Sequence, residues 1–127
     1  MRGITFPAWQ GPHYVTLAEL LVHLGSYGLG LRWRVECDEK WDLPAELERR
    51  SAGEGMDTLT LLSLTTPAVQ LIDAEACGFA EGVLVVVLTE VDSSFWDVRA
   101  ADERVLSELR HHYPSATELC SRPNGRS

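Results

Sequence analysis

Two pairs of carboxylates, each spaced by two residues, are the first groups in this sequence that could do chemistry. The pairs are Asp73 with Glu75 and Glu90 with Asp92. Because side chains alternate along a strand, each pair lies on one face of its predicted strand. Carboxylate oxygens suit a divalent cation, and a carboxylate with a displaced pKa can act as a general acid or base. A solvated strand face or an acidic docking surface would use the same residues without catalysis.

The stretch VDSSFWDV sets two aromatic side chains between acidic residues. Phe95 and Trp96 lie between Asp92 and Asp97, on a predicted connection towards the last helix. Neighbouring residues of an extended chain face opposite ways, so we expect one aromatic in the core and the other at least partly exposed. An exposed indole with carboxylates around it suits a basic partner, and DEKWDL repeats this chemistry. The predicted partner-binding residues are Trp41, Asp42, Asp92, Phe95, Trp96 and Asp97, with Asp73, Glu75 and Glu90 as a possible acidic face.

Histidine, cysteine and glycine patterns do not indicate a catalytic or metal site. The sequence has no H-x-x-x-H, H-E-x-x-H or Cys/His ladder, the patterns in which zinc ligands are usually spaced. Phosphate-binding glycine loops and the G-x-S-x-G nucleophile motif are also missing from it. We therefore predict a protein that is not an enzyme and that holds no metal and no cofactor.

The acidic composition limits the classes of partner. The chain of 127 residues has a formal net charge of −8, and Lys40 is its only lysine. Binding to phosphate backbones depends on clustered Lys and Arg, so we predict no direct binding to nucleic acid. An acidic surface instead attracts basic proteins and speeds their capture.

Cysteine usage and hydropathy indicate a cytoplasmic protein without a membrane segment. No run approaches the ~20 apolar residues that span a bilayer, and the first residues, MRGITFPAWQGPHYV, lack the apolar core of a secretory signal. The three cysteines are widely spaced and odd in number, which argues against a disulfide framework. We expect the protein to be a monomer or a homodimer.

Helical patterns occur in several parts of the chain. A capping box at Thr16 begins a helix that we expect to end at Gly25. A period of four predicts a second helix over 101–113. Between them, Pro44 begins a short helical segment, and TLTLLSL after Asp57 fits a helix, although its alternation also permits a strand.

Strand patterns frame the carboxylates. Residues 31–37 alternate apolar with charged, which predicts a half-buried strand. Residues 83–88 are apolar at every position, which is typical of a central strand covered on both faces. A Glu-Gly step joins this run to the preceding one and predicts a hairpin. Residue-by-residue pairing along the two arms would set Asp73 opposite Glu90. Two like charges in this position are destabilising unless a cation or a basic side chain compensates them.

These elements predict an α+β fold, with a small, mainly antiparallel sheet of three to four strands and about three helices packed on it. We expect an extended N-terminal arm over 1–14, a single domain over 15–119 and a flexible tail over 120–127. The favoured function is a small acidic module that neutralises or regulates a protein partner, in the manner of an immunity protein, an antitoxin or an inhibitor. One alternative is a small enzyme or ligand-binding protein with a carboxylate-lined, possibly cation-binding pocket, and another is a structural homodimer subunit.

Overall fold

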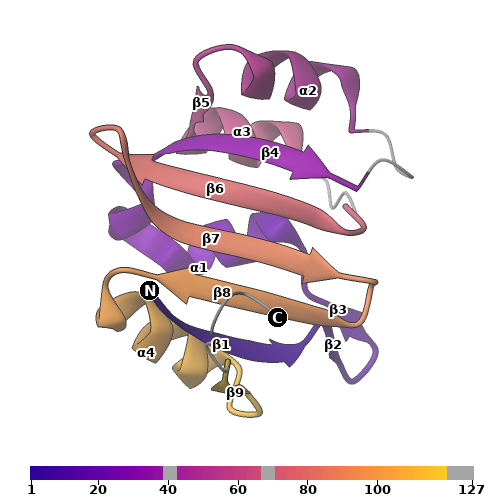
Figure 1. The fold of residues 1–127 in the computed structure, drawn as a ribbon. Coiled ribbons are helices and arrows are strands. Elements are labelled where there is room, and N and C mark those ends of the chain that lie inside the picture. The colour runs from indigo at the N-terminus through magenta and orange to yellow at the C-terminus, as the bar shows by residue number, and fades with distance from the viewer. Residues whose placement is uncertain (39–42, 67–70, 120–127) are drawn as a thin grey trace.

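A computed structural model describes residues 1–38, 43–66 and 71–119 (Figure 1). In these residues it has four helices, a seven-stranded antiparallel sheet and a separate two-stranded hairpin. The predicted α+β class and single compact domain are confirmed, whereas the sheet is larger than the three to four strands expected. None of the helices in the described ranges is long and apolar enough to cross a membrane.

The large sheet contains all but two of the strands. Its members are β1 (Arg2–Pro7), β4 (Arg32–Cys37), β5 (Met56–Asp57), β6 (Ala74–Ala80), β7 (Val83–Val91), β8 (Phe95–Ala100) and β9 (Thr117–Glu118). They lie in the order β5-β4-β6-β7-β8-β1-β9. The separate hairpin is β2 (Trp9–Gln10) with β3 (His13–Tyr14), and the helices are α1 (Leu17–Leu29), α2 (Ala45–Ala52), α3 (Thr58–Leu64) and α4 (Glu103–His112).

Side chains cap the helices where the sequence predicts a start. Thr16 Oγ1 accepts a hydrogen bond from the Glu19 amide at 3.2 Å, and Asp57 Oδ1 accepts one from the Thr60 amide at 2.8 Å. These bonds satisfy amide groups that a helix start leaves without partners. Asp57 therefore decides between the helix and the strand that TLTLLSL permits, in favour of α3.

The first helix is interrupted at Gly25, the predicted stop, but does not end there. The glycine has φ 59° and ψ −142°, and the chain bends there but continues as α1 to Leu29. A left-handed conformation of this kind is open to glycine without a steric penalty. Gly25 therefore breaks the helix with a kink, and a second helical segment of α1 follows it.

The segment expected as an N-terminal arm is extended, but most of it belongs to the sheet. β1 lies between β8 and β9, with Ile4 opposite both Val98 and Glu118. Ile4 and Phe6 are fully buried, whereas Thr5 between them is not. This short alternation is a strand signal, but only the pairing with β8 brings β1 into the interior of the sheet.

The aromatic segment is a strand of the sheet and not a connection to the last helix. Asp92 and Ser93 adopt left-handed φ values of 52° and 60°. The chain reverses there, and the Ser94 amide donates to the Val91 carbonyl at 2.8 Å. β8 therefore runs back along β7, which puts Val91 opposite Phe95.

The predicted hairpin at Glu81-Gly82 is confirmed, but the predicted register is wrong by one residue. Ala80 pairs with Val83 as expected, and the pairing then skips one residue of β7 at a bulge. Beyond the bulge, Glu75 lies opposite Thr89, so Asp73 is not opposite Glu90. A bulge of this kind changes the position of every later residue on one arm.

The two faces of the sheet have different surroundings (Figure 1). The helices α1, α3 and α4 pack on one face, here called the helix face, while α2 lies along β4 at one side of the sheet. No helix of the described segments crosses the other face, which points to the viewer. We call this the open face, and its side chains include Arg32, Arg34, Glu36, Glu75, Cys77, Phe79, Leu84, Val87, Thr89, Val91, Phe95, Asp97, Arg99 and Thr5.

Candidate partner-binding site

A row of acidic side chains crosses the open face at one end of the sheet. Glu36 on β4 lies opposite Glu75 on β6, which lies opposite Thr89 on β7, and Thr89 lies opposite Asp97 on β8. Residues directly opposite one another share a face. The like charges that the sequence places at Asp73 and Glu90 therefore meet instead at Glu36 and Glu75.

Two exposed aromatic side chains lie near this row. Phe95, two residues before Asp97 on β8, is 46% exposed, and Trp9 is 49% exposed. Trp9 Nε1 donates to the Ser93 carbonyl at 3.0 Å, which fixes the indole beside the β7–β8 turn. We define the acidic end as Glu36, Glu75, Asp92, Asp97, Trp9 and Phe95. It brings together four of the nine residues predicted from the sequence, Glu75, Asp92, Phe95 and Asp97. It adds Glu36 and Trp9, the second of which the sequence placed in an N-terminal arm.

Among the described residues, two side chains are seen to donate to Glu75 of the acidic row, and one of them is Cys77, whose Sγ lies 3.9 Å from Oε1. Thr89 Oγ1 donates to Glu75 Oε2 at 3.2 Å. None of the ion pairs found between described residues includes Glu36, Glu75 or Asp97. This part of the open face therefore presents negative charge outwards.

Trp96 does not belong to this site. Its side chain is 2% exposed, and its Nε1 donates to the Val15 carbonyl at 2.8 Å on the helix face. The prediction that Trp96 anchors a partner is therefore wrong, because the strand alternation turns it into the core. The expectation of one buried and one exposed aromatic is confirmed, with Phe95 as the exposed member. Trp41 and Asp42 lie outside the described residues.

Glu90 is also removed from the acidic face by its burial. It is 1% exposed and accepts hydrogen bonds from the Tyr14 hydroxyl, from the Asp73 amide at 2.9 Å and from the Ser93 amide at 3.3 Å. A buried carboxylate is tolerated when donors satisfy it in this way. Glu90 thus joins the small hairpin, the start of β6 and the β7–β8 turn beneath the acidic end.

Asp73 supports the same turn from the other strand. Its Oδ1 accepts a hydrogen bond from the Asp92 amide at 2.7 Å. Asp73, like Asp92, has a left-handed φ, of 54°. Among the residues of known placement, no three His, Cys, Asp or Glu side chains are arranged to hold a metal ion. Asp73 and Glu90 therefore have a structural explanation as acceptors of backbone amides.

Cys77 lies next to the acidic row on the open face. Burial, followed by the charges of Glu75 and Glu36, raises the pKa of the Cys77 thiol to about 11. A thiol acts as a nucleophile through its thiolate. The environment of Cys77 therefore keeps the thiol protonated and unreactive near neutral pH. Its side chain is partly buried.

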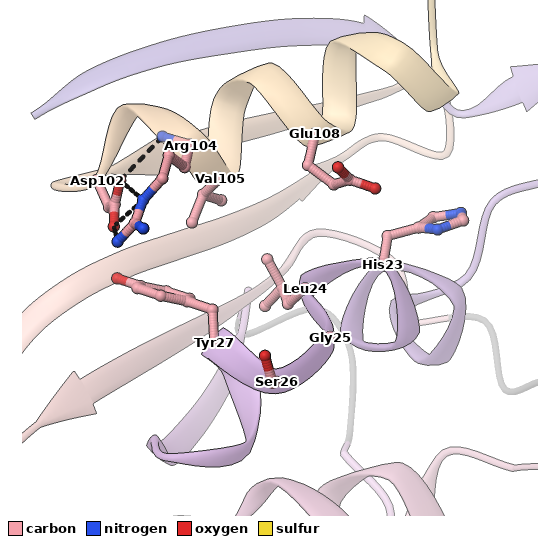
Figure 2. A pocket seen from close by; sticks show the side chains of 9 residues that line it. All are labelled: His23, Leu24, Gly25, Ser26, Tyr27, Asp102, Arg104, Val105 and Glu108. Carbon is pink, nitrogen blue, oxygen red and sulfur yellow. Dashed lines mark hydrogen bonds and ion pairs between the residues drawn. The ribbon is translucent and has the colours of Figure 1, made fainter.

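A pocket of about 470 Å³ lies between α1 and α4, on the helix-covered side (Figure 2). Its lining residues are His23, Leu24, Gly25, Ser26, Tyr27, Asp102, Arg104, Val105 and Glu108. Figure 2 shows Leu24 and Val105 in the middle, with His23 and Glu108 towards one end and Tyr27 below the Asp102–Arg104 pair at the other. The four carboxylates that the sequence offered for a ligand pocket, Asp73, Glu75, Glu90 and Asp92, do not line this one.

The polar groups at the two ends of the pocket are already partly engaged. The Arg104 guanidinium donates to Asp102 at 2.8 Å and lowers the pKa of that carboxyl. At the other end, the His23 ring stacks on His112 with 3.7 Å between centroids. Burial, and after it the neighbouring His112, lowers the pKa of His23.

The described residues thus present two features, on opposite sides of the sheet. Glu36, Glu75, Asp97 and Phe95 of the acidic end lie on the open face, and the pocket lies among the helices that cover the other face. The chain matches no protein-family model, no curated protein and no solved structure.

Proposed function

We propose that this protein is a small protein-binding module whose acidic end docks a basic segment of a partner protein and so neutralises or regulates it. The observation that carries the proposal is the row of Glu36, Glu75 and Asp97 beside the exposed Phe95, on a sheet face without a helix in the described residues. The partner is therefore a protein that offers Lys or Arg side chains.

The acidic row favours a cation from outside the molecule. Glu36 and Glu75 are directly opposed on neighbouring strands, and such like-charge pairs are destabilising. A lysine or arginine placed over them would interact favourably with both carboxylates. A guanidinium group could do so in bidentate geometry, which makes Arg the better candidate than Lys.

The aromatic side chains supply the apolar part of the contact. Phe95 and Trp9 are exposed at this end of the sheet. Aromatic residues with polar groups around them are the usual energetic centres of protein interfaces. Arg side chains also bind the faces of aromatic rings, so the same partner residue could contact a ring and a carboxylate.

The overall charge supports capture of a basic partner over a distance. A net charge of −8 speeds the encounter with a positively charged protein. This attraction acts between exposed groups and is therefore screened by salt. Binding should weaken strongly as the ionic strength rises.

The direct test is a titration of the ¹⁵N-labelled protein with an arginine-rich peptide, followed by NMR at low and at physiological salt. We expect amide shifts at Glu75, Asp97 and Phe95, and binding at least ~10-fold weaker at the higher salt, in line with screening of exposed charges. A glutamate-rich peptide is the control ligand. Shifts spread over α4, or equal binding of both peptides, would contradict the proposal.

A matched pair of double variants tests whether the peptide binds at the acidic end. Glu75→Gln with Asp97→Asn removes two charges from the acidic row and should reduce peptide binding at least ~10-fold. Glu48→Gln with Glu54→Gln removes two exposed carboxylates elsewhere and should leave binding within about 2-fold. An equal loss of peptide binding in both double variants would show that only the net charge matters and that the acidic end is not the binding site.

A second candidate function is the binding of a small molecule in the pocket between α1 and α4. The observation that favours it is the pocket of about 470 Å³ with an apolar centre and polar ends. A ligand would raise the melting temperature by mass action. Ser26→Trp, which fills the pocket, should abolish that shift, and a panel of metabolites that gives no shift would remove this candidate.

A further inference from the structure

The central strand β7 is apolar on both of its faces. Val86 and Leu88 are fully buried on the helix face, while Leu84, Val87 and Val91 lie on the open face. A strand with one solvated face normally alternates apolar with polar residues. The composition of β7 therefore matches a strand covered on both sides, whereas the helices of the described residues cover only one.

The charges beside β7 form two rows of opposite sign. Arg34 on β4 and Arg99 on β8 lie in one row, with Cys77 and Val87 between them. The next row towards the acidic end holds Glu36, Glu75, Thr89 and Asp97. The open face is thus basic along one line and acidic along the neighbouring line.

This pattern is complementary to itself under one two-fold rotation. With the axis across the strands, between the two rows, Arg34 faces the partner's Glu36 and Arg99 faces the partner's Asp97. On β7 the same rotation sets Leu84 against the partner's Val91. A two-fold contact uses the same patch on both subunits, so each such pair occurs twice.

The other simple orientation is unfavourable. A two-fold axis along β7 exchanges the strands on its two sides, so Glu75 would face the partner's Asp97 and like charges would meet. The charge pattern therefore selects the arrangement with the axis across the strands. Two sheets packed in this way resemble the two layers of a β-sandwich.

We propose that two copies of this chain associate through their open faces, with Arg34 and Arg99 of each copy on the acidic row of the other. The apolar side chains of β7 then lie inside the contact, which accounts for its second apolar face. The inference goes beyond the proposed function, because the occupant is a second copy. The two bound states exclude each other, since both use Glu36 and Asp97.

Sedimentation velocity of the full chain over a range of concentrations tests the dimer. Wild type should be dimeric at the upper end of the range. Asp97→Arg places two arginines side by side on β8 and should weaken association at least ~10-fold. A chain that stays monomeric at every concentration would overturn the inference.

A charge swap separates this contact from a general effect of charge or folding. The double variant Asp97→Arg with Arg99→Asp keeps the net charge and restores complementarity, so it should dimerise within about 3-fold of wild type. Glu48→Arg changes the net charge as Asp97→Arg does but lies on α2, and it should remain dimeric. A swap variant that is folded by circular dichroism and still monomeric would refute the pairing, as would equal weakening by Glu48→Arg.

The same samples distinguish this inference from the proposed function. If both hold, the arginine-rich peptide should bind the acidic end and dissociate the dimer. A monomeric wild type that binds the peptide would remove only the dimer. A dimer that the peptide neither binds nor dissociates would remove the proposed function and leave the dimer.

Discussion

The two faces of the sheet carry similar residue types in different surroundings. On the helix face, the carboxylate of Glu90 is buried and accepts three hydrogen bonds, and Trp96 donates to a backbone carbonyl. On the open face, Glu75 opposes another carboxylate, and Phe95 is 46% exposed. Residue type alone therefore does not assign a role, because adjacent positions of one strand, such as Phe95 and Trp96, differ in burial and in hydrogen-bond partners.

The largest difference in stability between substitutions on the two faces should come from Phe95 and Trp96, the neighbouring aromatic residues of β8. Trp96→Ala leaves a cavity and an unpaired Val15 carbonyl, so we expect a loss of about 3–5 kcal/mol in the free energy of unfolding. Phe95→Ala removes an exposed ring and should cost less than about 1 kcal/mol. Urea denaturation of both variants measures this, and equal losses would mean that the two rings are equally buried.

The two carboxylates should differ almost as strongly. Glu90→Leu leaves the amides of Asp73 and Ser93 and the Tyr14 hydroxyl without their acceptor, and should lower the free energy of unfolding by about 3 kcal/mol. Glu90→Gln keeps one acceptor oxygen and should lose less. A thermal or urea denaturation series gives the comparison, and a fully stable Glu90→Leu variant would show that these bonds contribute little.

Protonation of His23 should destabilise the helix-covered side of the sheet. The pKa of His23 is lowered from its ordinary value of 6.5, first by burial and then by His112. The unfolded chain therefore takes up the proton more readily, so stability is full above pH 6.5 and falls as the pH drops from there to the folded pKa. His23→Gln should make the melting temperature less dependent on pH over that range.

A matched histidine variant keeps this test specific. His111 is exposed and contacts His112 edge to face, whereas His23 lies against the His112 ring. His111→Gln should leave the fall in melting temperature below pH 6.5 unchanged. The same loss of pH dependence in both variants would assign the effect to the overall charge of α4 instead of the stacked pair.

The smallest effect, and one of opposite sign, should come from the open face. Glu75→Gln removes one member of an opposed like-charge pair, so we expect an increase of about 0.5 kcal/mol in the free energy of unfolding. Added salt should shrink this gain, because the pair is close to solvent. A loss of stability on this substitution would indicate that the Glu75 carboxylate already makes a favourable interaction within the protein.

Local signals in the sequence predicted the elements that depend on neighbouring residues. The capping side chains Thr16 and Asp57 begin helices where expected, and the Glu81-Gly82 turn joins β6 to β7. The alternation of Arg34 and Glu36 with apolar residues marks β4 correctly. The caps and the hairpin turn depend on bonds within a few residues along the chain, and β4 is recognised by its local alternation although its partners β5 and β6 are distant in sequence.

The candidate site was only partly predictable, because its geometry depends on strand pairing. The sequence predicted Asp92, Phe95 and Asp97 as partner-binding residues, and the structure brings all three to one end of the sheet. It could not show that a bulge in β7 shifts Glu75 to lie opposite Thr89. Trp9 was missed because its place beside the turn depends on a bond to Ser93, far along the chain.

Local periodicity and composition were enough to predict the α+β class, the helix starts, the central apolar strand and the excess of negative charge. Only the tertiary structure decided that β1 and β8 complete a seven-stranded sheet, that Trp96 faces inwards and that Glu36 meets Glu75. The physical reason is that side-chain direction in a sheet has a period of two. A single skipped residue or an added strand pair therefore changes which face, and which neighbours, each residue has.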